Sequence, residues 1–85
     1  MRYRDKIVIK SAKQFAEKLN QCLDETDAPP SIRERTVILS KMLDISKQEA
    51  WNFLEGLDIP DHDIMQKIAH EFEVDLKWLE GDINL

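Results

Sequence analysis

One short segment of the chain carries polar side chains spaced so that they can contact another molecule together. If residues 46–55 form a helix, Ala50, Phe53 and Leu54 share one face and point toward a core. The opposite face then carries Lys47, Gln48, Trp51, Asn52 and Glu55, with Glu49 at its edge. A lysine can donate to guanine, and each amide side chain can form paired hydrogen bonds with adenine. The alternative is that these are ordinary solvated positions.

The same residues belong to a longer segment, 35–56, whose pattern predicts two helices joined by a tight turn. Leu39, Met42 and Leu43 recur at helical spacing before the turn. Ile45 lies in the turn, and Gly56 follows the second helix, where a left-handed residue is favoured. Two short helices joined in this way form a helix-turn-helix unit, which places its second helix in the DNA major groove.

The rest of the chain predicts further helices around this unit. Serines that begin a capping box, followed three residues later by Glu or Gln, occur at Ser11, Ser31 and Ser46. Asp61 and Asp75 are the expected caps of two later helices. The first expected helix covers residues 12–24. The second begins at residue 31 or nearer 35 and ends at 43 or 44, and the third covers residues 46–55. Two more helices follow the aspartates. The prediction is therefore an all-α domain of five helices over residues 11–85.

Residues 1–10 are basic and contain three consecutive β-branched residues, Ile7 to Ile9. A lone strand has no partner inside an otherwise helical chain. We therefore expect a basic N-terminal arm, or a strand that pairs with its copy in a dimer. Arg2, Arg4 and Lys6 are the residues with which such an arm would enter a groove of DNA, although short basic leaders are often only solvated tails.

Size and charge limit the classes of function. The chain has 85 residues and a net charge of −5, which argues against a nucleic-acid partner. The charge is unevenly distributed, because residues 1–18 carry six basic and two acidic side chains. Binding to nucleic acid depends on the charge of the surface that contacts phosphate rather than on the net charge of the chain. No apolar run reaches membrane-spanning length, and no signal peptide is evident. The single cysteine, Cys22, is expected in the core of a cytoplasmic protein.

Enzymatic chemistry is not expected. Asp61, His62 and Asp63 resemble a metal-binding cluster, but adjacent residues at a helix start point in different directions, and capping explains both aspartates. His70 is expected at the surface or at its boundary. No glycine-rich phosphate loop occurs. We therefore predict no catalytic residue, no metal, no cofactor and no small-molecule substrate.

The order of several motifs resembles the phage-repressor-like helix-turn-helix family (lambda repressor and Cro, or Xre), and its prophage-regulator branch. The resemblance spans about residues 15–82 and rests on these residues: Phe15 to Asn20, Pro29-Pro30, Leu39-Ser40, Leu43, Ile45-Ser46, Ala50, Phe53, Gly56, Pro60, Ile68-Ala69, Val74, Trp78-Leu79 and Gly81. It implies a five-helix domain that binds double-stranded DNA as a homodimer. The implied function is that of a transcriptional regulator, most simply a repressor, that reads a near-palindromic operator.

The resemblance also implies roles for particular residues. Lys47, Gln48, Trp51 and Asn52 would read bases, and Arg33, Arg35, Thr36 and Ser46 would hold phosphate. Ser46 would do so through its backbone amide at a helix N-terminus. The chain departs from the family at Asp44, where glycine is usual in the turn, and at Trp51 and Asn52, which lower the charge of the reading helix.

Trp51 leaves several interpretations open. It can contact a thymine methyl group, lie in a dimer interface, bind a partner protein or turn inward. An outward tryptophan in an acidic chain supports an alternative function, a protein-interaction module on the same fold, such as an antitoxin, antirepressor or adaptor.

Overall fold

The computed structural model describes the backbone of residues 2–80 and the side chains of residues 12–80. It consists of five helices: α1 (Arg2–Glu25), α2 (Ile32–Leu43), α3 (Lys47–Glu55), α4 (His62–Phe72) and α5 (Leu76–Glu80). The prediction of an all-α chain is confirmed for residues 2–80, which contain the expected number of helices. No strand occurs among the described residues.

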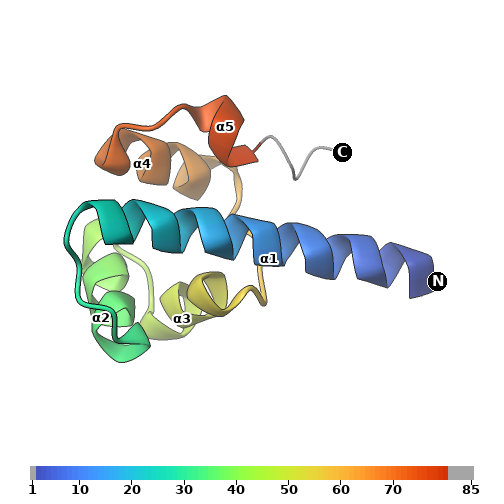
Figure 1. Cartoon of the computed structure of the whole chain (residues 1–85), viewed down its shortest axis with the longest axis horizontal. Helices are drawn as coiled ribbons and strands as arrows, with labels where there is room; N and C mark the ends of the chain where they lie inside the picture. The colour runs from blue at the N-terminus through green and yellow to red at the C-terminus, as the bar shows by residue number, and fades with distance from the viewer. Residues whose placement is uncertain (1, 81–85) are drawn as a thin grey trace.

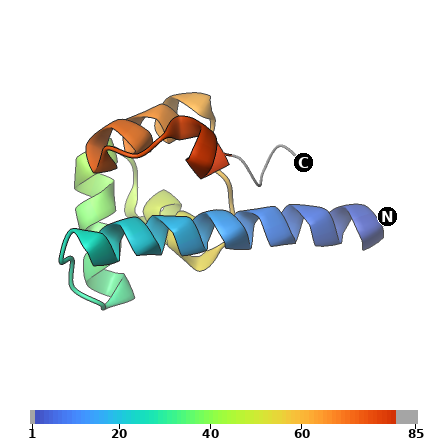
Figure 2. The ribbon, with the colours of Figure 1, turned by 45° about the horizontal axis from the view of Figure 1, so that its top comes forward.

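The long helix α1 lies among the other four helices, and α2 also packs against α4, where the Lys67 ammonium reaches the Leu43 carbonyl. In Figure 1 the helices α4 and α5 lie above α1, and α2 and α3 lie below it. Figures 1 and 2 both show that the N-terminal part of α1 extends beyond the other helices. A helix of 24 residues is about 36 Å long at 1.5 Å per residue. The longest dimension of the molecule is 37 Å, so α1 alone spans it.

The start of α1 corrects two predictions. Residues 2–10 are helical, so the expected arm or strand is wrong for them. Ser11 lies inside α1 and cannot begin a capping box there. The physical reason is that no Gly or Pro occurs before Pro29 to interrupt a helix. Met1 and residues 81–85, which include Gly81 of the family resemblance, lie outside the described residues.

The core lies between α1 and the other four helices. Phe15 on α1 and Phe53 on α3 meet edge to face, with ring centroids 6.3 Å apart. Both are buried, with these neighbours: Leu19, Leu23, Leu39, Leu43, Ala50, Leu54, Met65, Ile68 and Leu79. Cys22 is also buried, and burial, with a smaller contribution from Glu25, raises the pKa of its thiol. This confirms its expected place in the core.

Caps and turns determine where α2 and α3 begin and end. The Ser31 hydroxyl accepts from the Glu34 amide at 3.5 Å, and Ser46 and Glu49 form the complete capping box that the sequence predicts. Gly56 ends α3 with φ of +76°. A Cβ added there would lie 3.2 Å from the Cα of Lys13. Glycine is therefore needed both for its backbone conformation and for the close approach of α1.

Among residues 2–80, three residues other than glycine adopt the left-handed conformation: Asp27, Asp44 and Glu73. Asp44 joins α2 to α3 with φ of 57°, as its place in the predicted turn requires. Glu73 follows α4 with φ of 55°, and its amide donates to the carbonyls of Ala69 and His70. Each of these conformations is strained for an L side chain.

We expect Glu73→Gly to raise the free energy of unfolding by about 0.5–1 kcal/mol, because glycine relieves the left-handed strain at the end of α4 but costs more backbone entropy. Urea denaturation monitored by circular dichroism measures the change. Glu71→Gly is the control, since Glu71 is an exposed residue within α4. That substitution should lower stability by about 1 kcal/mol. Equal destabilisation by both glycines would contradict the explanation.

Candidate nucleic-acid interface

The outer face of α3 presents the polar residues that the sequence predicts. Lys47 and Gln48 are exposed and Asn52 is half-buried, whereas Ala50, Phe53 and Leu54 face the core. The amide nitrogen of Gln48 donates to the Asn52 side-chain oxygen at 3.1 Å. The two amides therefore lie side by side along one row of α3, one helical turn apart. Together they can present hydrogen-bond donors and acceptors to one edge of a ligand.

Ser46 cannot use its backbone amide for phosphate in this arrangement. The amide donates to a carboxylate oxygen of Glu49 at 3.3 Å, and the Ser46 hydroxyl accepts from the Glu49 amide at 3.0 Å. The Glu49 carboxylate also brings negative charge to the N-terminus of α3, where an anion would otherwise be favoured. The predicted phosphate contact of Ser46 competes with this capping box, because both use the same backbone amide.

Arg35 requires a correction, because its side chain is buried rather than exposed to a phosphate. Its Nε donates to the Pro29 carbonyl at 2.6 Å, and Nη1 donates to the Asn20 side-chain oxygen at 2.9 Å. Nη2 forms an ion pair with Asp24. Only 6% of Arg35 is exposed. Its guanidinium joins α1, the Pro29-Pro30 loop and α2, and the predicted phosphate role is replaced by a structural one.

Thr36 also differs from the prediction. It is 8% exposed, and its hydroxyl donates to the Ile32 carbonyl at 2.7 Å. Its hydrogen is therefore already used within α2. Of the four residues expected to hold phosphate, Arg33 alone has an exposed side chain whose charge is available to a ligand at this surface. Lys47 adds a second cation from α3.

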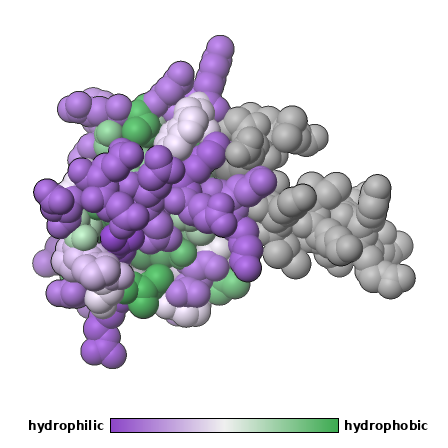
Figure 3. Space-filling model, viewed as in Figure 1, coloured by the Kyte–Doolittle hydropathy of each residue, from purple (hydrophilic) through white to green (hydrophobic). Residues whose placement is uncertain are grey.

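Arg33 and Lys47 lie at a hollow of about 510 Å³ between the first turns of α2 and α3. The lining residues of this Trp51 hollow are Ile32, Arg33, Thr36, Val37, Lys47 and Trp51. Trp51 is 38% exposed, so the interpretation in which it turns inward is wrong. Figure 3 shows a largely hydrophilic surface on which small apolar patches lie over α2 and α3.

Ile32 and Val37 were not among the predicted site residues. Ile32 begins α2 and is 36% exposed, beside Trp51 in the hollow. The available sequence signal was its position directly after the cap Ser31, at the N-terminal end of α2. Whether that end meets α3 depends on how α2 and α3 cross, which spacing alone does not determine.

The predicted arm residues Arg2, Arg4 and Lys6 belong to the helical part of α1. Their side chains lie outside the described side chains. The structure therefore replaces an extended arm by a helix, and we assign these residues no contact.

Charge differs between the two sides of α1. Residues 58–80, which contain α4 and α5, carry seven carboxylates and two lysines, a net charge of −5. Residues 31–57, which contain α2 and α3, carry four basic and four acidic side chains. Residues 31–57 are thus electrically balanced, whereas residues 58–80 are strongly acidic. In the view of Figure 1, α4 and α5 lie on the other side of α1 from α2 and α3.

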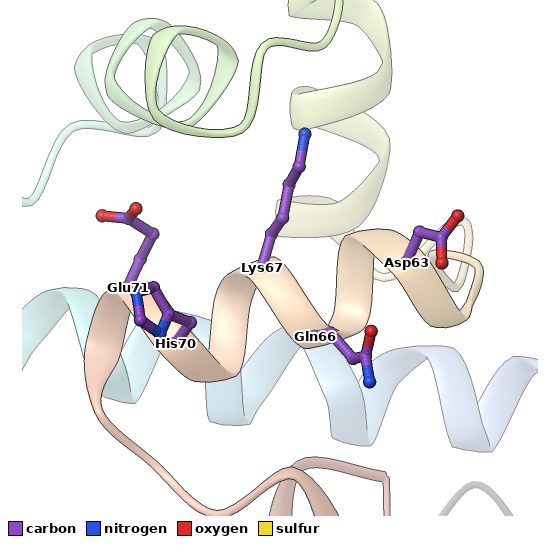
Figure 4. Close-up of a pocket in the computed structure, with 5 residues that line it drawn as sticks. All are labelled: Asp63, Gln66, Lys67, His70 and Glu71. Carbon is purple, nitrogen blue, oxygen red and sulfur yellow. The ribbon is translucent and has the colours of Figure 1, made fainter.

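A second hollow, of about 490 Å³, lies along α4 and is lined by Asp63, Gln66, Lys67, His70 and Glu71 (Figure 4). Its side chains spread along the helix rather than converging, and Lys67 points toward the turn between α2 and α3. The Lys67 ammonium donates to the Leu43 carbonyl at 3.5 Å and so caps α2. Among residues 12–80, no group of three His, Cys, Asp or Glu residues is arranged to hold a metal ion.

The neighbouring Asp61 and His62 also have structural partners. Asp61 accepts from the Ile64 amide at 3.0 Å and caps α4. The His62 Nδ1 lies 3.4 Å from a carboxylate oxygen of Glu80, at the end of α5. The two side chains therefore connect parts of the fold.

The chain matches no known protein family, no curated protein and no solved structure. None of the described helices combines the length and the apolar character that crossing a bilayer requires. The geometry of α2 and α3 is therefore the basis for any functional conclusion.

Proposed function

We propose that the protein is a sequence-specific DNA-binding regulator of the phage-repressor-like class, which acts as a repressor by occupying its operator. The observation that carries the proposal is the outward polar row of α3, in which the amide nitrogen of Gln48 lies 3.1 Å from the side-chain oxygen of Asn52. In a helix-turn-helix domain this face enters the major groove. Amide side chains bind the edge of adenine through two hydrogen bonds, so this row can distinguish base pairs.

Dimer formation follows from the same proposal. A single α3 of nine residues reads only a few base pairs. Two copies related by a two-fold axis would place their α3 helices about 34 Å apart and read a near-palindromic operator.

We expect the proposed site to appear in a titration of the labelled protein with duplex DNA selected for binding from a random library. NMR shift changes should concentrate on residues 46–52 and on Arg33, and affinity should fall steeply between about 50 and 200 mM salt. Shift changes centred on α4 and α5 would contradict the assignment of the interface. Absence of duplex binding even at low salt would overturn the function.

We expect Gln48→Ala and Asn52→Ala each to weaken binding to the selected duplex by about 1–3 kcal/mol and to relax the preference at one base pair. The reason is the loss of an amide that pairs with a base edge. Fluorescence anisotropy with the selected duplex and its single-base variants measures both effects. Gln66→Ala is the matched control, because Gln66 is an exposed glutamine on α4. Equal affinities for all three variants would mean that α3 does not read bases.

A second candidate function is a protein-interaction module of the antitoxin, antirepressor or adaptor type. Exposure of Trp51 and Ile32 beside each other favours it, because adjacent apolar side chains at a surface often bind a protein. The structural use of Arg35, Thr36 and Ser46 also reduces the number of groups left for phosphate. The salt-dependent duplex titration separates the two functions.

A further inference from the structure

The Trp51 hollow contains exposed apolar surface that the fold does not use. The apolar residues with which α3 packs into the core are Ala50, Phe53 and Leu54. Trp51 stands outside that set and is 38% exposed, with Ile32 at 36% beside it. Tryptophan is among the side chains that most often contribute strongly to binding when a partner covers them. Trp51 is therefore available for contact with another molecule, and the residues around it decide which.

The polar groups around this apolar surface restrict what fits there. Two cations, Arg33 and Lys47, line the hollow, and no carboxylate is among its lining residues, although the chain carries a net charge of −5. The hydroxyl of Thr36 already donates to the Ile32 carbonyl. The hollow therefore suits an apolar group that has negative charge next to it.

The hollow also has a fixed position relative to the polar row of α3. Lys47 and Trp51 are four residues apart and form a second row, directly beside the row of Gln48 and Asn52. A ligand that pairs with the amides of the first row therefore has its neighbouring atoms over Trp51. In the major groove, an adenine edge that pairs with an amide lies beside the 5-methyl group of a thymine, and phosphates flank both.

We propose that the Trp51 hollow receives the 5-methyl group of one thymine in each operator half-site, while Arg33 and Lys47 contact the adjoining phosphates. The proposal rests on the proposed function and adds a specificity-determining contact to it. Ile32 and Val37 of α2 line the hollow together with Trp51, so α2 as well as α3 takes part in selecting the base. A protein ligand would need apolar surface and acidic groups, but it would not need the amide row beside the hollow.

The test replaces each thymine of the selected duplex, one at a time, by deoxyuridine, which removes only the methyl group. Burial of one methylene-sized group is worth about fourfold in affinity. We expect one thymine per half-site at which the wild-type protein loses about fourfold. Trp51→Ala should weaken binding to the thymine duplex and lose the discrimination against deoxyuridine at that position. Such a double-mutant cycle measures the coupling between the side chain and the methyl group.

Two further variants make the result specific. Trp78→Ala is the matched control, because Trp78 is also 38% exposed but lies on α5 beside Lys18. It should keep the discrimination at every thymine. Ile32→Ala should reduce the discrimination in part, which gives a second measure of the hollow from another helix. Circular dichroism of each variant verifies that the helices are retained.

Each other outcome overturns the inference. If Trp51→Ala weakens binding equally on thymine and deoxyuridine duplexes, the ring contacts sugar or phosphate. If the wild-type protein binds duplex but tolerates every deoxyuridine, the hollow does not hold a methyl group, and DNA binding itself still stands. If no duplex is bound at low salt, the proposed function fails as well, and a protein ligand becomes the explanation for the hollow.

Discussion

Replacing Arg35 by alanine is expected to lower the free energy of unfolding by about 3 kcal/mol. The guanidinium is buried and donates to the Pro29 carbonyl and to both oxygens of Asn20. Removing it leaves the half-buried acceptors of Pro29 and Asn20 without this donor, where a group fully deprived of water would cost about 1–3 kcal/mol. The ion pair with Asp24 adds little, because 67% of that carboxylate side chain is exposed.

Lysine cannot replace Arg35 well. Its single ammonium cannot reach the Pro29 carbonyl and the Asn20 oxygens in the directions that a planar guanidinium provides. Arg35→Lys should therefore still cost about 2 kcal/mol. Urea denaturation followed by circular dichroism, with the slope m held constant, measures both losses.

Arg33→Ala is the matched control for these variants. Arg33 lies on the same helix two residues earlier and is exposed, so its loss should change stability by less than about 0.5 kcal/mol. It should weaken duplex binding and reduce the salt dependence instead. An Arg35→Ala protein as stable as the wild type, with weaker duplex binding, would restore Arg35 to the phosphate contacts.

Phe53→Ala is expected to have the largest effect, a loss of about 3–5 kcal/mol. The ring is 96% buried, since only 4% of the residue is exposed, and it meets Phe15 edge to face. The substitution removes that pair and leaves a cavity between α1 and α3. Natural domains are stable by only about 5–15 kcal/mol, so much of the available stability would be lost. Thermal and urea denaturation measure the change.

Phe53→Leu separates the cavity from the loss of the aromatic pair. Leucine keeps most of the volume, so this variant should lose no more than about 1.5 kcal/mol. Trp51→Ala, on the outer side of the same helix, should change stability far less than Phe53→Ala. If Trp51→Ala were as destabilising as Phe53→Ala, Trp51 would be part of the core and its exposed face would need another explanation.

The parts of the fold that depend on neighbouring residues could be predicted from the sequence. Capping by Ser46 and Glu49 involves residues three positions apart, and the left-handed ends at Asp44 and Gly56 follow from their places after apolar helices. The outward row of Gln48 and Asn52 follows from helical spacing once the apolar face is known. These local rules predicted α2, α3, the turn between them and the outer face of α3.

Predictions that depend on contacts between distant residues were less successful. Arg35 has the residue type and position of a phosphate contact, but its partner Asn20 lies fifteen positions earlier on another helix. A clue was present, because Asn20 and Asp24 are polar residues one turn apart beside the apolar stripe of α1. The Trp51 hollow likewise depends on how α2 meets α3. The sequence pattern does not specify that crossing.

The uneven charge on the two sides of α1 has a consequence for how fast the protein finds a polyanion. With a net charge of −5 on residues 58–80 and a balanced charge on residues 31–57, the molecule has an electric dipole across α1. Approach with α4 and α5 in front is repelled, so encounters are biased toward the side of α2 and α3. The protein can therefore be acidic as a whole and still rotate its balanced side toward a polyanion before contact.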